Sequence, residues 1–210
     1  MAERAIPHFS YDHPTKDKIL DASVKLFAVK GYDAVTMRDI SEVVGIAQGS
    51  IYNHYKSKEE LIEDVMSRFE QKYKFYFDWL INVNAKAKTL EEVMDNMFTE
   101  LLKVRDLSNY YGISLLVKEH FKNEAARERL FRLIYMDSIN WMQADFDRLM
   151  VKGVIPQCDS KTIASIIMWS VLACNDLRIY ENIGTELPID CTEMYANLKT
   201  FLTAALRKGA

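Results

Sequence analysis

A short stretch of hydrogen-bonding side chains in the N-terminal third of the chain has the chemistry needed to contact nucleic acid. These groups are amide, hydroxyl, imidazole, phenol and ammonium, carried by Gln48, Ser50, Asn53, His54, Tyr55, Lys56 and Lys58. Side chains of this kind reach base edges and phosphate oxygens. From Gly45 to Lys58 the sequence holds two lysines and no acid, which suits a polyanion. The segment predicts a DNA-contacting surface.

The surrounding residues predict the two helices that would position those side chains. Thr36 and Asp39 stand three apart in a capping-box arrangement that starts a helix. Gly45 can adopt the left-handed conformation of a tight turn and ends that helix. A second short helix follows from about Gln48 to His54, with Ile51 among the apolar residues that pack it against the first. Together they form a helix-turn-helix over residues 36–55.

The same segment resembles the DNA-binding domain of the TetR family of transcriptional repressors over roughly residues 15–62. The resemblance is carried by LFAVKGYDAVT (Leu26–Thr36), by the pair Asp39–Ile40 and by GIAQGSIYNHYKSKEEL (Gly45–Leu61). It implies an N-terminal three-helix DNA-binding domain, followed by a helical body that dimerises and binds a small effector. The remainder of the chain agrees with the family in length, helicity and order of elements.

The resemblance also implies roles for individual residues in DNA binding. Tyr52, Tyr55 and Lys58 correspond to phosphate contacts, and Thr36 and Arg38 to backbone contacts at the start of the second helix. The groove-facing side would carry Gln48, Gly49, Ser50, Asn53 and His54. From the pattern alone, Tyr52 and Tyr55 could equally pack within the domain as core residues.

The composition and the sparse glycines and prolines predict an all-helical protein of about nine helices. The 210 residues are 49% hydrophobic and 27% charged with a net charge of −3, as in an ordinary globular protein. No glycine or proline occurs between Ser50 and Tyr111, which favours long helices. Since the chain is not basic overall, we expect modest DNA affinity per monomer, with dimerisation supplying the rest.

Three regions follow along the sequence: a flexible arm at 1–13, the DNA-binding domain at 14–66 and the effector-binding and dimerisation domain at 67–210. We expect the domain boundary inside a long helix that Ser57 and Glu60 start. The remaining helices are expected at 14–30, from Thr89 to about Arg105, at 107–119 with an interruption or kink near Gly112, at 124–152, from Asp159 to Asn182, and from Asp190 onward.

Catalysis and metal binding are poorly supported. The histidines, at 8, 13, 54 and 120, include no pair four residues apart, and the three cysteines form no CxxC. No phosphate-binding glycine loop or nucleophile elbow is present. We therefore expect no enzyme activity, cofactor or metal. The apolar stretch Ile163–Cys174 is short of a membrane span and is expected to be a buried helix, so a cytoplasmic location is expected.

The body is rich in aromatic and methionine side chains, whose default role is core but which also line ligand pockets. The candidates for an effector pocket are Phe98, Tyr110, Tyr111, Phe121, Tyr135, Asp137, Asn140, Trp141 and Trp169. The last two helices, 160–182 and 190–207, carry apolar residues on more than one face. That pattern fits a homodimer interface, as the family resemblance implies, or a central helix in a monomer.

The resulting hypothesis is a homodimeric transcriptional repressor, released from a palindromic double-stranded DNA operator by a small, hydrophobic effector. Two alternatives remain open. One is a helical-bundle lipid or small-molecule carrier, or an enzyme, with a vestigial helix-turn-helix. The other is an activator of the same fold, which sequence does not separate from a repressor.

Overall fold

The computed structural model describes residues 14–99, 108–185 and 190–207, and within these ranges the chain is helical with no strand. Counting contiguous α and π segments as one, the described residues form nine helices, as the sequence predicts. Contacts divide the chain into two units. Of the described residues, 14–74 and 108–130 form the head unit, and 75–99, 131–185 and 190–207 form the body unit. The expected arm at 1–13 lies outside the described residues.

This division differs from the expected boundary near Met66 in two ways. The long helix changes unit at Lys74–Phe75, and a segment from the C-terminal part of the sequence, 106–130, belongs to the head unit. The reason for the second difference is packing at long sequence separation, which the local pattern of residues does not report.

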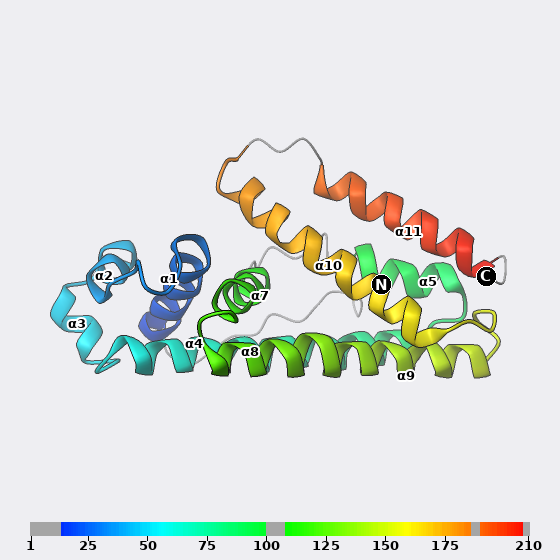
Figure 1. The fold of residues 1–210 in the computed structure, drawn as a ribbon, viewed down its shortest axis with the longest axis horizontal. Coiled ribbons are helices and arrows are strands. Elements are labelled where there is room, and N and C mark those ends of the chain that lie inside the picture. The colour runs from blue at the N-terminus through cyan, green and yellow to red at the C-terminus, as the bar shows by residue number, and fades with distance from the viewer. Residues whose placement is uncertain (1–13, 100–107, 186–189, 208–210) are drawn as a thin grey trace. The chain divides into compact units, whose positions relative to one another are not determined.

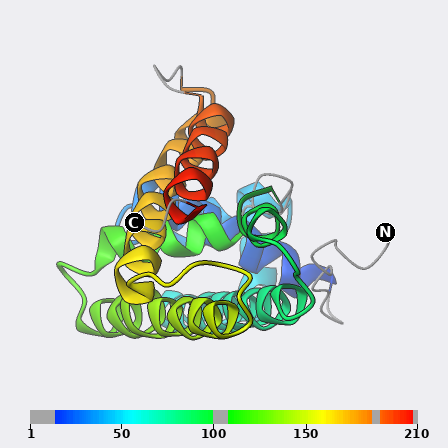
Figure 2. The same cartoon turned by 90° about the vertical axis from the view of Figure 1, so that its right-hand side faces the viewer.

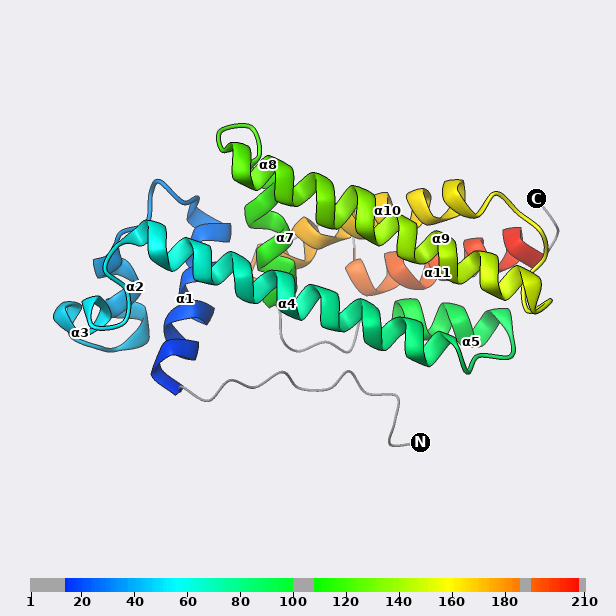
Figure 3. The same cartoon turned by 90° about the horizontal axis from the view of Figure 1, so that it is seen from below.

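The head unit consists of α1 (Pro14–Lys30), α2 (Met37–Val44), α3 (Gln48–Tyr52), α4 (Lys58–Asn84) as far as Lys74, α7 (Ser108–Glu119) and α8 (Glu124–Leu130). Figures 1 and 3 show α1, α2 and α3 gathered at the N-terminal end of α4. Helix α1 packs against both α2 and α7, and α2 packs against α3. The core between them is apolar, with fully buried Ile19, Phe27, Ile40, Ile51 and Leu61.

Local sequence accounts for the helix-turn-helix. The Thr36 hydroxyl accepts from the Asp39 N–H, and the Asp39 carboxylate accepts from the Thr36 N–H at 2.7 Å, which completes the predicted capping box. Gly45 has φ 76°, and the N–H groups of Gly45 and Ile46 both donate to the Ser41 carbonyl. This left-handed turn ends α2 after two turns and starts the chain toward α3.

Gly112 has a different role from the one expected. Helix α7 runs unbroken from Ser108 to Glu119, so an interruption near Gly112 is wrong. A Cβ at this position would lie 2.2 Å from Cδ2 of Phe69 on α4. The glycine is therefore required for the close approach of α7 to the Phe69 ring.

The body unit consists of the end of α4, α5 (Leu90–Met94), η1 (Asp95–Thr99), η2 (Phe131–Asp137), α9 (Ser138–Val151), α10 (Ser160–Asn182) and α11 (Cys191–Arg207). The predicted starts at Thr89, Asp159 and Asp190 are confirmed by side-chain caps on the following turns. Helix α10 packs on α9, and α10 and α11 lie side by side (Figure 2). Ion pairs Lys199–Asp95 and Arg207–Glu91 join α11 to η1 and α5.

Helix α10 is less buried than the sequence suggested. By length and composition, Ser160–Tyr180 is apolar enough to cross a membrane, with a mean hydropathy of 1.3, and 35% of that window is buried. Ile166 and Trp169 are exposed, as are Tyr180 and, on α11, Phe201. The expectation of a buried helix therefore holds for one face only, because the other face has no cover within the described part of the chain.

Replacing Gly112 by alanine tests the close approach of α7 to α4. We expect Gly112→Ala to lower the free energy of unfolding by about 1–3 kcal/mol, because the new Cβ must displace the Phe69 ring. Gly49→Ala is the matched control: its Cβ would meet nothing within 4 Å, so the change should be neutral or stabilising by about 0.5–1 kcal/mol. Denaturant unfolding measures both. Equal effects would show that Gly112 is not a packing contact.

Candidate nucleic-acid interface

The outward face of α3 and its flanks carries most of the side chains that the sequence assigned to DNA. Ser50 is half-buried, and the following seven are exposed: Thr36, Arg38, Gln48, Gly49, Tyr52, Asn53 and His54. The Tyr52 side chain is 46% exposed, so it does not pack in the core. Amide, imidazole and phenol groups thus lie together on one solvent-facing surface, as base and phosphate contacts require.

The remaining two predicted contacts, Tyr55 and Lys58, lie differently. Tyr55 is 2% exposed and its hydroxyl donates to Oδ2 of Asp64 at 2.7 Å. Burial, the hydrogen bond and the charge of Asp64 all raise the pKa of Tyr55, so the phenol stays neutral. The structure places Tyr55 in the core, the alternative that the sequence left open. Its hydroxyl is engaged inside the domain and does not face DNA.

Lys58 holds the turn that precedes α2. Its ammonium donates to the carbonyl oxygens of Tyr32 and Val35, each at 3.0 Å, and lies 4.2 Å from the centroid of the Tyr32 ring. An ammonium has three N–H donors, so one remains for a phosphate. The structure therefore gives Lys58 a positioning role in addition to the phosphate contact that the sequence predicted.

The same turn is held from α7 by residues that the sequence analysis did not identify. The Tyr32 N–H donates to Oε1 of Glu119 at 3.2 Å, and the Lys118 ammonium donates to the Ala28 carbonyl near the end of α1. Burial, followed by the charge of Glu59, raises the pKa of Tyr32 to about 12. Because 87 positions separate Tyr32 from Glu119, no local motif could have indicated this contact.

The two residues at the start of α2 are partly committed to local contacts. Arg38 Nε donates to Oε1 of Glu42 at 2.9 Å, in a pair whose two side chains are 72% and 61% exposed. An exposed pair of this kind contributes little stability, so the guanidinium can exchange Glu42 for a phosphate. The Thr36 hydroxyl donates to Asp39 at 2.7 Å, so a DNA contact there would compete with the capping box.

Tyr55 contacts two charged side chains, Asp64 and Lys16. Asp64 Oδ2 lies 2.7 Å from Nζ of Lys16, and that ammonium lies 5.4 Å from the centroid of the Tyr55 ring. Burial alone would raise the pKa of Asp64, but the hydrogen bonds from Lys16 and Tyr55 outweigh it and hold the pKa below its ordinary value. The carboxylate is therefore ionised at neutral pH.

The residues proposed for an effector pocket are divided between the two units. Tyr110, Tyr111 and Phe121 belong to the head unit, and Phe121 is 84% exposed, so it encloses nothing there. Phe98, Tyr135, Asp137, Asn140, Trp141 and Trp169 belong to the body unit. Of these, the rings of Tyr135 and Trp169 are in contact, with centroids 5.2 Å apart, while Asn140 is exposed.

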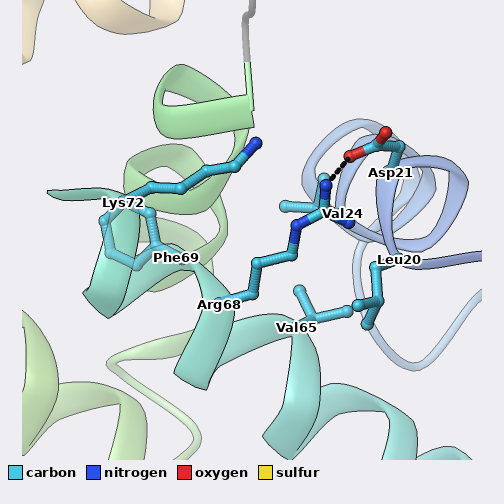
Figure 4. A pocket seen from close by; sticks show the side chains of 7 residues that line it. All are labelled: Leu20, Asp21, Val24, Val65, Arg68, Phe69 and Lys72. Atoms are coloured by element: carbon cyan, nitrogen blue, oxygen red, sulfur yellow. Dashed lines mark ion pairs between the residues drawn. The ribbon is translucent and has the colours of Figure 1, made fainter. Parts of the chain in front are cut away.

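A small hollow lies between α1 and α4 within the head unit (Figure 4). Its empty volume is about 240 Å³, which includes space open to solvent. Leu20, Val24, Val65 and Phe69 form its apolar lining, and Arg68 pairs with Asp21 at 3.1 Å on its rim. Lys72 on α4 also lines the hollow. Among the described residues, no three His, Cys, Asp or Glu side chains gather as a metal site.

Comparisons with known proteins find similarity in the segment that carries this surface. Residues 19–65 match the model of the bacterial regulatory proteins of the tetR family. Over 92 residues the chain is 33% identical to the HTH-type transcriptional repressor KstR2 of Mycolicibacterium smegmatis, which covers 44% of this chain and 38% of KstR2. Over 89 residues it is 41% identical to IcaR of Staphylococcus epidermidis, the negative transcriptional regulator of the biofilm operon icaADBC, covering 42% of this chain and 46% of IcaR.

The matched segments thus span less than half the length of either relative. Across nearly the whole chain, the fold is similar to the crystal structure of a TetR-family transcriptional regulator from Rhodococcus. The TM-score is 0.68 at 16% identity, covering 93% of this chain and 100% of that one. This likeness shows a common fold.

The lowered pKa of Asp64 predicts a pH-dependent contribution to stability. A carboxyl whose folded pKa lies below its unfolded value stabilises the fold above the unfolded pKa of about 4, and loses that contribution as pH falls through the folded pKa. We expect Asp64→Asn to lower the free energy of unfolding by about 1 kcal/mol at pH 7, since both partners of the pair are partly exposed.

Below about pH 4 the difference between the natural chain and Asp64→Asn should shrink. Urea unfolding at a series of pH values from 7 to 3 measures it. A difference that stayed constant over this range would show that the charge of Asp64 does not stabilise the head unit.

Proposed function

We propose that the chain is a repressor of the TetR family of transcriptional regulators that binds a palindromic operator as a homodimer. The observation that carries this proposal is the surface of α3. Gln48 at the start of α3, and Asn53 and His54 directly after its end, are exposed to solvent, while Ile51 of the same helix is fully buried. A short helix with polar groups outward and one apolar anchor inward is suited to enter a major groove.

The proposed DNA contacts fall into base contacts and phosphate contacts, according to what each side chain can reach. We assign base reading to the segment of Gln48, Gly49, Ser50, Asn53 and His54, in which amide, hydroxyl and imidazole side chains can hydrogen-bond to base edges and the glycine allows close approach. Phosphate contacts are assigned to Thr36, Arg38, Tyr52 and the third N–H of Lys58. Tyr55 leaves the set, because its ring is buried and its hydroxyl is bound to Asp64.

The exposed apolar face of α10 and α11 supports dimerisation. Ile166, Trp169 and Tyr180 on α10 and Phe201 on α11 are each more than 40% exposed. Large apolar side chains gathered on neighbouring helices are typical of protein–protein interfaces. A second copy placed by a two-fold axis would cover both faces at once and present two copies of α3 to successive major grooves, about 34 Å apart.

Regulation by a small hydrophobic effector is proposed for the body unit, where Phe98, Tyr135, Trp141 and Trp169 are available to line a site. Helix α4 belongs to both units, so a change in the body unit can pass to the head unit along a continuous helix. Coupling of this kind is typically about 1–3 kcal/mol, enough to release an operator. As a regulator of DNA, the protein would act in the cytoplasm.

Selection of bound sequences from a random duplex pool, at about 150 mM salt, tests the proposed function. We expect enrichment of a palindrome whose half-sites are centred about one helical turn, or 10–10.5 base pairs, apart. Enrichment of no sequence by the purified, folded protein would reject a sequence-reading repressor. It would favour a carrier or enzyme with a vestigial head, and mass spectrometry for a co-purified small molecule would then follow.

Two substitutions on the selected palindrome separate phosphate contact from base reading. Arg38→Ala should weaken binding to the palindrome and to a scrambled duplex alike, and reduce the salt slope by about 1. Gln48→Ala should weaken the palindrome alone, by about 1–3 kcal/mol. Arg127→Ala is the matched control, since Arg127 is an exposed arginine of the head unit paired with Glu124. If Gln48→Ala weakened binding to both duplexes equally, bases would have to be read by another face of the domain.

A further inference from the structure

One carboxylate oxygen joins three parts of the head unit. Oδ2 of Asp64, on α4, accepts the Tyr55 hydroxyl at 2.7 Å and lies 2.7 Å from the Lys16 ammonium. Tyr55 comes three residues after the last residue of α3, and Lys16 lies in the first turn of α1. The oxygen therefore ties the exit of α3 to α1 and α4.

Helix α3 needs such a tie because it does little to fix its own direction. It has five residues, and its N-cap, Ala47, makes no side-chain capping bond. Ile51 is its buried residue, and an apolar contact is not directional. The hydrogen bond between the Tyr55 phenol and the Asp64 carboxylate is directional and involves an ionised acceptor, so it is stronger than a neutral bond.

The geometry points to Asp64 and Tyr55 as positioning residues for DNA reading, which fix the orientation of α3 through their shared hydrogen bond. Tyr55 thus acts on DNA affinity from inside the domain. The part of this inference that concerns DNA rests on the proposed function, whereas the part that concerns the mobility of α3 does not.

The charges around Asp64 are consistent with that role. Lys16 from α1 and Arg68, one turn further along α4, both lower the pKa of Asp64. Arg68 also donates to the Asp17 carbonyl at 3.2 Å and pairs with Asp21, so it binds α1 independently of Asp64. Loss of the Tyr55 hydroxyl would therefore leave α1 joined to α4 and act selectively on α3.

Hydrogen exchange of the free protein tests the inference without DNA. We expect Tyr55→Phe to speed amide exchange over residues 48–55 about fivefold, the effect of one buried hydrogen bond, with α1 and α2 unchanged. Ser23→Ala is the matched control, since Ser23 is a fully buried hydroxyl of the same unit that donates to Ile19 within α1. Unchanged exchange over 48–55 in Tyr55→Phe, or the same change in Ser23→Ala, would overturn the inference.

Variants of Asp64 distinguish an effect on the orientation of α3 from an effect on the overall stability of the protein. Asn keeps an oxygen that can accept from Tyr55 but loses the charge, so Asp64→Asn should speed exchange over 48–55 less than Tyr55→Phe does. Asp64→Ala should match Tyr55→Phe, and the double variant should be no worse than either, because both remove the same bond. Independent, additive effects of the two would contradict a shared bond.

On the selected palindrome, Tyr55→Phe should weaken binding about fivefold and leave scrambled DNA within twofold, because phosphate contacts tolerate a less ordered α3. Equal weakening on both duplexes would overturn the positioning role in DNA reading. If the natural chain selects no DNA sequence but hydrogen exchange over 48–55 changes as expected, the proposed function is wrong. The inference that the Tyr55–Asp64 bond fixes the orientation of α3 is then still supported.

Discussion

The head unit depends on contacts that fix the direction of α3, because this helix is too short to be stable by itself. A first helical turn fixes several residues for one hydrogen bond, so a segment as short as α3 gains little from its own backbone. Its direction is set instead at its two ends. The left-handed Gly45 turn determines how the chain enters α3, and the buried Tyr55 determines how it leaves. The outward polar side chains can read a groove only because these ends are fixed.

The unit that provides this support is not continuous in sequence. Helices α7 and α8 come from the second half of the chain, and α7 packs with α1 while α8 packs with α7. Glu119 and Lys118 bond to the backbone at the end of α1 and in the turn after it, and Lys58 binds that turn from α4. Arg129 on α8 pairs with Glu63 and Glu70 on α4. The turn leading into α2 is thus held by side chains from two other helices.

Features determined by neighbouring residues were predictable from the sequence. The Thr36–Asp39 box, the Gly45 turn and the caps at Thr89, Asp159 and Asp190 depend on residues within a few positions of one another. The exposed face of α3 followed from the same local pattern. For this reason the helical fold and most of the proposed DNA surface could be derived before the structure.

Features that depend on contacts between residues far apart in the sequence were not predictable from it. Whether Tyr55 faces a phosphate or the core depends on Asp64 and Lys16, which local spacing does not bring together. The packing of Gly112 against Phe69, the grouping of 106–130 with the head unit and the open face of α10 are also long-range properties. The pocket candidates come from both units, because aromatic content alone does not distinguish a core from a site.

The central claim, that this head unit reads sequence through α3, is tested most directly by salt. Affinity for the selected palindrome and for a scrambled duplex of equal length would be measured from about 50 to 300 mM salt. The account predicts a linear fall of log affinity with log salt for both duplexes, and a palindrome preference of about a thousandfold or more near 150 mM. Equal affinities at every salt concentration would contradict it.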